Sequence, residues 1–207
     1  MARKAQTKPR KHASQTRSRA TVDALIEATA RILVKDGFDK ASTNRIAEKA
    51  GVSVGSLYQY FPGKEALVAA VMKRHNQELM QVMRDSLAAV EKLPIEQAVR
   101  ELVAAAIRGH RIDPALHRVL AEQTPRTNRL EDTDILNPQA YALFKTFLEA
   151  RSNELRVADT ELAAFVCVTS IEALTHNAVL HHSASFTDET FEALADEATR
   201  LVVRYLR

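Results

Sequence analysis

The stretch from Ser42 to Lys64, STNRIAEKAGVSVGSLYQYFPGK, constrains the fold more than any other part of the chain. Its first apolar residues share one face of a short helix, at the spacing i, i+1 and i+4: Ile46, Ala47 and Ala50. Gly51 stands where a left-handed residue commonly ends a helix, and Ser53 is a natural N-cap for a second helix over about Val54 to Tyr60. The pattern predicts two short helices joined by a tight turn.

The second of these helices has two different faces. A rotation of about 100° per residue places three apolar side chains inward: Val54, Leu57 and Phe61. The same rotation leaves Gly55, Ser56, Gln59 and Tyr60 outward, with Tyr58 at the border. Glutamine pairs with adenine, serine with several base edges and tyrosine hydroxyls with phosphates. This acid-free face predicts contact with a DNA groove, and an ordinary helical corner inside a bundle is the alternative.

The same residues carry a family resemblance. GVSVGSLYQYFPGKEAL, preceded by STNRIAEKA and GFDKA, resembles the DNA-binding domain of TetR-family transcriptional regulators over about residues 17–72. Beyond that segment the chain matches the family in length and helical character. The resemblance implies an all-helical homodimer that binds operator DNA through its N-terminal domain and a small ligand through its C-terminal domain. It also implies phosphate contacts at Thr43 and Lys64.

We predict which of these residues contact bases and which contact phosphates. Gln59 and Ser56 would read bases, whereas the tyrosines, Thr43, Lys64 and Ser53 would hold phosphates. Thr43 begins a helix, where free N–H groups and the helix dipole attract an anion. The predicted DNA-binding set is Thr43, Arg45, Ser53, Val54, Gly55, Ser56, Tyr58, Gln59, Tyr60 and Lys64.

Two further segments complete the predicted N-terminal domain. An apolar stripe from Val22 to Leu33 predicts a helix over about residues 18–36, which Gly37 ends. Residues 1–16 hold basic side chains and no acid, so we predict a disordered basic arm. This arm is either a solvated tail or a segment that lies on DNA phosphates or in the minor groove.

The rest of the chain is predicted to be helical. Of the five glycines, four lie before residue 64 and only Gly109 follows, too few for a sheet-rich body. We expect a long connecting helix over residues 64–92, then helices at about 95–111, 114–123, 138–155, 159–181 and 187–206, with a polar loop over 124–137. The fold class is therefore all-α. An arm (1–16), a three-helix helix-turn-helix DNA-binding domain (17–63) and the connecting helix (64–92) precede a helical ligand-binding and dimerisation bundle (93–207).

Charge is divided unevenly along the chain. The first 64 residues carry +8 (13 basic, five acidic) and the remainder −5 (16 basic, 21 acidic). A basic end on an acidic body suits a partner with phosphates. The last two predicted helices are each apolar on a broad side, so they pack on each other or form half of a four-helix dimer bundle. A dimer would place two recognition helices in successive major grooves, about 34–36 Å apart.

The body offers candidates for a ligand pocket. Apolar and polar residues predicted to face inward are Met72, His75, Leu79, Met83, His110, His117, Phe144, Phe147, Phe165 and His176. Packed core is the alternative for each of them, because periodicity does not separate a pocket wall from a core position.

Other functional classes have little support. No histidine pair shows the i, i+4 spacing with a carboxylate that marks a zinc site, and Cys167, the only cysteine, lies in an apolar run typical of a core thiol. The G-x-G-x-x-G and P-loop patterns are absent, so we expect no enzyme activity, no metal and no cofactor. No run reaches the ~18 apolar residues of a membrane span, and the basic N-terminus lacks the apolar segment of a signal peptide. We therefore expect a cytoplasmic protein.

These observations predict a sequence-specific DNA-binding transcriptional regulator, a repressor released from a palindromic operator by a small apolar ligand. A ligand-independent activator or architectural DNA-binding protein is one alternative. A helical protein-interaction module is another.

Overall fold

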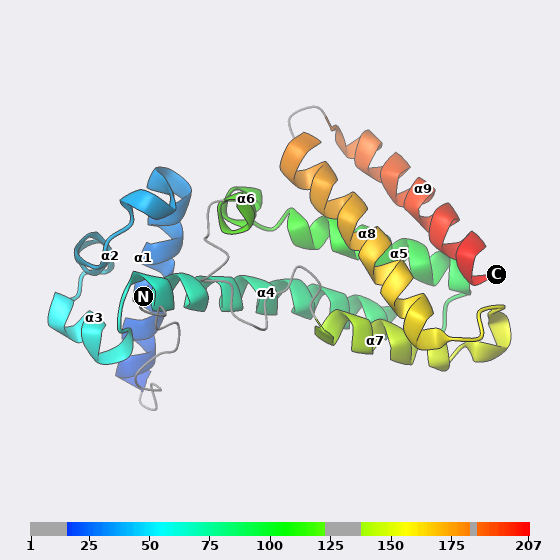
Figure 1. Ribbon diagram of the computed structural model, residues 1–207, viewed down its shortest axis with the longest axis horizontal. Helices are drawn as coiled ribbons and strands as arrows, with labels where there is room; N and C mark the ends of the chain where they lie inside the picture. The colour runs from blue at the N-terminus through cyan, green and yellow to red at the C-terminus, as the bar shows by residue number, and fades with distance from the viewer. Residues whose placement is uncertain (1–15, 123–137, 183–185) are drawn as a thin grey trace, which may run out of the picture. The chain divides into compact units, whose positions relative to one another are not determined.

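The computed structural model describes residues 16–122, 138–182 and 186–207, and every regular element in these ranges is a helix (Figure 1). The α-helices are α1 (Thr16–Lys40), α2 (Thr43–Ala50), α3 (Val54–Tyr60), α4 (Lys64–Ala89), α5 (Ile95–His110), α6 (Pro114–Glu122), α7 (Pro138–Glu149), α8 (Thr160–His182) and α9 (Asp188–Leu206), and a 3-10 turn, η2, covers Ser152–Glu154. The all-α prediction is confirmed. The predictions of a basic arm and of a loop over 124–137 concern segments that lie outside the described residues, save Thr16.

The chain divides into two compact units. The first comprises described residues 16–76 and 115–122, and the second comprises 77–114, 138–182 and 186–207. Helix α4 supplies residues to both. The sequence placed α6 with the C-terminal bundle, but its buried residues Leu116, Val119 and Leu120 belong to the core of the first unit.

The core of the first unit forms around α1. Leu25 and Leu33 are fully buried there, as the apolar stripe predicted, and the buried Thr29 hydroxyl donates a hydrogen bond to the Leu25 carbonyl at 2.7 Å. Gly37 has φ 79°, a left-handed conformation that favours glycine, so the long part of α1 ends there as predicted. Phe38 follows and is buried in the same core, which also receives α2 and α3.

An ion-pair group joins α1 to α4 within the first unit. Glu27 accepts hydrogen bonds from Arg31 and from Arg74, each at 3.0 Å. The hydrogen bond from Arg31, supported by Arg74, holds the pKa of Glu27 below its ordinary value. Because a lowered pKa favours the charged form in the folded state, this contribution to stability is present near neutral pH and is lost as the pH falls through the lowered value.

The second unit is a helical bundle. Helix α5 packs against α8 and α9, and α7 packs against α8 (Figure 1). The sequence predicted one helix over 138–155, whereas α7 ends at Glu149. The guanidinium of Arg151 donates hydrogen bonds to the carbonyls of Val90 and Glu91, at 2.9 and 2.6 Å, and lies 4.2 Å from the centre of the Phe147 ring. These contacts hold the chain in a turn where the helix would otherwise continue.

Helix α8 carries the apolar centre of this bundle. Among the described residues, it is the one helix long and apolar enough to cross a membrane, a composition that the core helix of a soluble protein shares. Its residues Ala163, Ala164, Cys167 and Ile171 are buried within the second unit. Burial raises the pKa of the Cys167 thiol from 9.0 to about 12, which fits the predicted core thiol.

Candidate DNA interface and ligand cavity

The turn between α2 and α3 has the geometry that the sequence predicted. Gly51 has φ 69° and ψ 28°, and a Cβ atom at this position would meet nothing within 4 Å. Its backbone conformation, rather than close packing, therefore favours glycine. The N–H groups of Gly51 and Val52 donate to the carbonyls of Glu48 and Ala47, at 3.1 and 3.0 Å, so the turn itself satisfies two of the last four carbonyls of α2.

Ser53 begins α3 as predicted. Its Oγ accepts a hydrogen bond from the Ser56 backbone N–H at 3.1 Å and lies 2.8 Å from Oγ of Ser56. Ser53 is also the centre of a Gly-x-Ser-x-Gly pentapeptide, the spacing of the nucleophile in α/β-hydrolases. That nucleophile sits on a strand-to-helix turn, whereas Ser53 caps a helix that follows another helix. The pentapeptide therefore matches the hydrolase pattern in sequence but not in structure.

The exposed face of α3 differs from the predicted face at two residues, Ser56 and Tyr60, which are half-buried although both were predicted to point outward. Gly55, Gln59 and Tyr58 are exposed, and Leu57 is fully buried. Tyr60, predicted to point outward, is half-buried against the core of the first unit, and Tyr58, placed at the border, is 40% exposed. The reason is helical spacing: Tyr60 lies three residues after the buried Leu57, on nearly the same face, while Tyr58 is rotated by about 100° from it.

Two predicted phosphate-binding side chains already touch. The hydroxyl of Thr43, at the start of α2, lies 3.2 Å from the hydroxyl of Tyr58 on α3. Ser42 caps α2 by accepting the N–H of Arg45 at 3.4 Å. The start of α2 and the exposed face of α3 thus form one hydroxyl-rich surface.

The two predicted cations, Arg45 and Lys64, are turned toward their own unit. Arg45 forms an ion pair with Asp36 at 2.6 Å and donates to the Lys40 carbonyl at 2.9 Å. The ammonium of Lys64 donates to the Phe38 carbonyl at 3.1 Å and lies 4.1 Å from the centre of the Phe38 ring. An ammonium has three donors, so Lys64 retains hydrogen-bonding capacity beyond this carbonyl. Phosphate binding by either residue stays a prediction.

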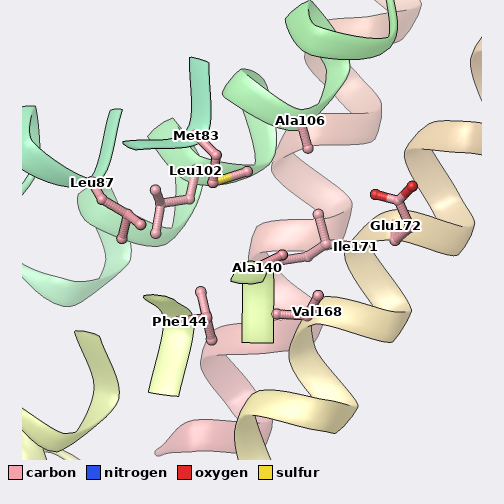
Figure 2. A pocket seen from close by; sticks show the side chains of 9 residues that line it. All are labelled: Met83, Leu87, Leu102, Ala106, Ala140, Phe144, Val168, Ile171 and Glu172. Atoms are coloured by element: carbon pink, nitrogen blue, oxygen red, sulfur yellow. The ribbon is translucent and has the colours of Figure 1, made fainter. Parts of the chain in front are cut away.

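A cavity of about 50 Å³ opens in the second unit. Figure 2 shows its side chains, which come from α4, α5, α7 and α8: Met83, Leu87, Leu102, Ala106, Ala140, Phe144, Val168, Ile171 and Glu172. Eight are apolar, and Glu172 supplies the only charge. Such a lining, apolar with one polar group, is typical of small-molecule sites.

Of the ten residues predicted for a ligand pocket, Met83 and Phe144 line this cavity and eight do not. Met72 is buried in the core of the first unit. His75 and His117 lie in the same unit, with Nε2 of His75 2.9 Å from Nδ1 of His117. The side chain of Leu79 packs against Gly109, and a Cβ atom added to that glycine would lie 3.2 Å from it. Phe147 is buried in the core of the second unit, and the guanidinium of Arg151 lies over its ring.

The other three lie beside the cavity or outside it. The rings of His110 and His176 pack edge to face with their centres 5.6 Å apart, and neither residue lines the cavity. Phe165 is 51% exposed and stacks on Tyr141. Helical periodicity gives a side chain's direction but not whether a neighbour fills the space it faces. One sequence feature could have pointed to the cavity: Glu172, which lines it, interrupts the apolar run AAFVCVTSIEAL.

Helices α8 and α9 also expose large apolar side chains: Leu162, Phe165 and Leu174 on α8, and Leu201 and Tyr205 on α9. Residues of both helices line a groove of about 340 Å³: Leu174, Leu194, Glu197, Ala198, Arg200, Leu201 and Arg204. Exposed apolar residues around such a groove are typical of an interaction surface.

Comparison with known families agrees with both units. Residues 25–71, which include α2 and α3, match the model described as "Bacterial regulatory proteins, tetR family". Residues 94–206 match "Tetracyclin repressor-like, C-terminal domain", which covers more than half of the chain. The chain belongs to the TetR family. Its members are helix-turn-helix transcriptional regulators that bind DNA, with a C-terminal ligand-binding domain.

Individual relatives are distant. The HTH-type transcriptional regulator PksA of Bacillus subtilis is 33% identical over 79 residues, 38% of either chain, so this match spans well under two thirds of that relative. BetI of Cronobacter sakazakii is 28% identical over 187 residues, 85% of this chain and 87% of BetI. Among solved structures, the fatty acid degradation regulator FadR from Bacillus halodurans has a TM-score of 0.68 at 20% identity, covering 96% of this chain and 99% of FadR. PfmR from Thermus thermophilus has a TM-score of 0.62 at 18% sequence identity, and the match covers 88% of this chain and 98% of PfmR. These structures share the fold.

Proposed function

We propose that this TetR-family protein is a cytoplasmic homodimeric repressor that binds a near-palindromic operator and is released by a small ligand. The observation that carries the DNA-binding part is the α3 surface. Gly55, Tyr58 and Gln59 are exposed on a helix that Ser53 caps and Leu57 anchors in the core. A fixed helix with an exposed, acid-free, hydrogen-bonding face suits the major groove.

The proposed dimer forms through α8 and α9. Their outer surface exposes Leu162, Phe165 and Leu201, each at least half exposed. Pairing these helices with those of a second copy would remove this surface from water in a four-helix bundle. Two-fold symmetry would then present two α3 helices to half-sites about one DNA turn apart.

The proposed ligand site is the cavity in the second unit. At about 50 Å³ it is smaller than the roughly 300–1,000 Å³ of an occupied drug-sized pocket. A ligand would therefore have to displace part of the lining, and Met83 and Leu87 are long, partly buried side chains of α4. Because α4 continues from them back to Lys64, ligand binding could favour a conformer in which the recognition helices no longer match the operator. This requires tighter binding to that conformer.

The direct test is selection of bound sequences from a random DNA pool with the purified protein at moderate salt. We expect enrichment of an inverted repeat, because a symmetric dimer reads the same half-site twice. Retention of DNA without enrichment would indicate a non-specific architectural binder. No retention at any salt would favour a helical protein-interaction module.

The selected operator then allows the repressor part to be tested. A reporter under this operator should be silent with the protein and active when a ligand of the cavity is added. Reporter activation by the protein alone would favour the ligand-independent activator. Catalysis has no part in the proposal, because the Gly-x-Ser-x-Gly serine serves as a helix cap.

A further inference from the structure

The chemistry of the cavity indicates which class of ligand it takes. We infer that its ligand is an apolar molecule that ends in a protonated amine, bound by Glu172. This inference rests on the proposal that the cavity is the ligand site of the regulator. It concerns only the second unit.

Glu172 is the only charged or polar residue in the lining. The eight others present aliphatic, thioether or aromatic groups, and Figure 2 shows the Glu172 carboxylate on the α8 side, away from Leu87 of α4. Its side chain is only 29% exposed. A carboxylate in such surroundings needs a hydrogen-bonding or cationic partner, because burial without one is unfavourable.

His110 uses part of the hydrogen-bonding capacity of the Glu172 carboxylate. Nε2 of His110 lies 3.3 Å from Oε2 of Glu172, and a carboxylate only accepts, so the imidazole is the donor. An ionised carboxylate has about four lone-pair sites on its two oxygens. One imidazole leaves several of them for another donor, and the hydrogen bond orients the group beside the cavity.

A protonated amine fits what remains. Its N–H groups can donate to the free sites of Glu172, and its charge is opposite to that of the carboxylate, which makes a short and strong hydrogen bond. A ligand carboxylate would bring a like charge to the only acid in the lining and has no proton to donate. An alcohol could donate one neutral hydrogen bond, which is weaker.

The test uses three six-carbon probes that differ only in the terminal group: n-hexylamine, 1-hexanol and hexanoate. Calorimetric titration at about pH 8 keeps the amine protonated and a free imidazole neutral. We expect hexylamine to bind the wild-type protein at least about tenfold more tightly than hexanoate. Hexanol should bind with an affinity between these two.

Two matched variants assign the effect to the carboxylate. Glu172→Gln keeps the size and removes the charge, so the preference for hexylamine over hexanoate should vanish while hexanol binding stays within about twofold. Glu161→Gln makes the same change on the same helix, at an exposed side chain that pairs with Lys145 and lies outside the lining. It should behave as wild type. Ala106→Met, which fills the cavity, should weaken all three probes.

Each contrary outcome has a definite meaning. Equal or tighter binding of hexanoate, or an unchanged preference in Glu172→Gln, would overturn the amine assignment while the cavity remained a ligand site. Unchanged hexylamine binding in Ala106→Met would place the amine elsewhere and overturn it as well. If no probe bound at millimolar concentration, the inference would fail. Enrichment of an inverted repeat in the probe-free DNA selection would show that DNA recognition stands independently.

Discussion

The hydroxyl groups of Thr43 and Tyr58 lie 3.2 Å apart, across the turn that separates α2 from α3. The pair links the N-terminus of one helix, which attracts anions, to the exposed face of the next. Both side chains are thereby held where one DNA strand could be contacted from two helices. In the proposed complex with DNA, this link between the two side chains would limit the entropy lost on binding.

Replacing Tyr58 with phenylalanine tests this link. Tyr58→Phe removes one exposed hydroxyl and leaves the ring, so we expect the free energy of unfolding to change by less than about 0.5 kcal/mol. Operator affinity should fall about three- to tenfold, because a phosphate contact and the link to Thr43 are lost together. Tyr141→Phe is the matched control, since its hydroxyl pairs with Thr169 in the second unit at 3.3 Å. Unchanged affinity in Tyr58→Phe would remove this tyrosine from the interface.

Gln59 is predicted to read a base rather than the backbone. Gln59→Ala should cost about 1–3 kcal/mol at one position of each half-site and relax the preference for that base, which sequence selection with the variant would show. Lys64→Ala is the comparison. It should weaken all DNA about equally and reduce the salt dependence, as expected for a phosphate contact. A Gln59→Ala variant that selects the wild-type sequence would exclude Gln59 from base recognition.

Two glycines of the same pentapeptide should respond oppositely to alanine. Gly51→Ala forces a left-handed conformation on alanine and should lower the free energy of unfolding by about 1–2 kcal/mol. Gly55→Ala lies inside α3, where the nearest atom to the new Cβ is Ser53 Oγ at 3.8 Å. It should leave stability unchanged or raise it by up to about 1 kcal/mol.

Operator affinity is the second property to measure in the Gly51→Ala and Gly55→Ala variants. Gly55→Ala adds a methyl group to the exposed face of α3 and should weaken operator binding, because the helix would be held away from the groove. Denaturant titration and operator binding measure the two effects separately. Equal loss of stability in both variants would contradict the assigned backbone conformations.

The helix-turn-helix was predictable because its signals are local. A helix cap, a left-handed glycine and an apolar spacing depend on a few neighbouring residues, and Ser53, Gly51 and Leu57 all take the predicted roles. The cavity was not predictable in this way. Whether Phe144 faces a cavity while Phe147 packs in the core depends on residues far away in sequence. The grouping of α6 with the first unit depends likewise on long-range packing, which periodicity does not contain.

Cys167 should be almost inert in the folded protein. Burial raises its pKa from 9.0 to about 12, so near pH 8 the reactive thiolate is about a thousandfold scarcer than in the unfolded chain. Labelling with a thiol reagent should be slow in buffer and fast in denaturant, and as the only cysteine it gives a single signal. Since the neutral thiol is favoured in the folded state, its contribution to stability should be constant below about pH 9 and decrease above it. Native labelling as fast as in denaturant would contradict the burial.

The apolar surface on α8 and α9 makes the strongest prediction about assembly. Leu201 is 50% exposed, so its replacement costs a monomer little, but in the proposed dimer it would lie between two copies. Leu201→Glu would place one carboxylate from each copy in the proposed interface, and burying unpaired charges is strongly unfavourable. We expect a monomer by light scattering.

Ile112→Glu is the matched control for this prediction. Ile112 is 48% exposed and lies outside α8 and α9, so its replacement should leave the dimer intact. Operator affinity in Leu201→Glu should fall by orders of magnitude, because each monomer reads only one half-site, whereas the helicity and the selected half-site should not change. If Leu201→Glu remained dimeric, the two copies would have to meet through another surface, and α8 and α9 would need a different partner.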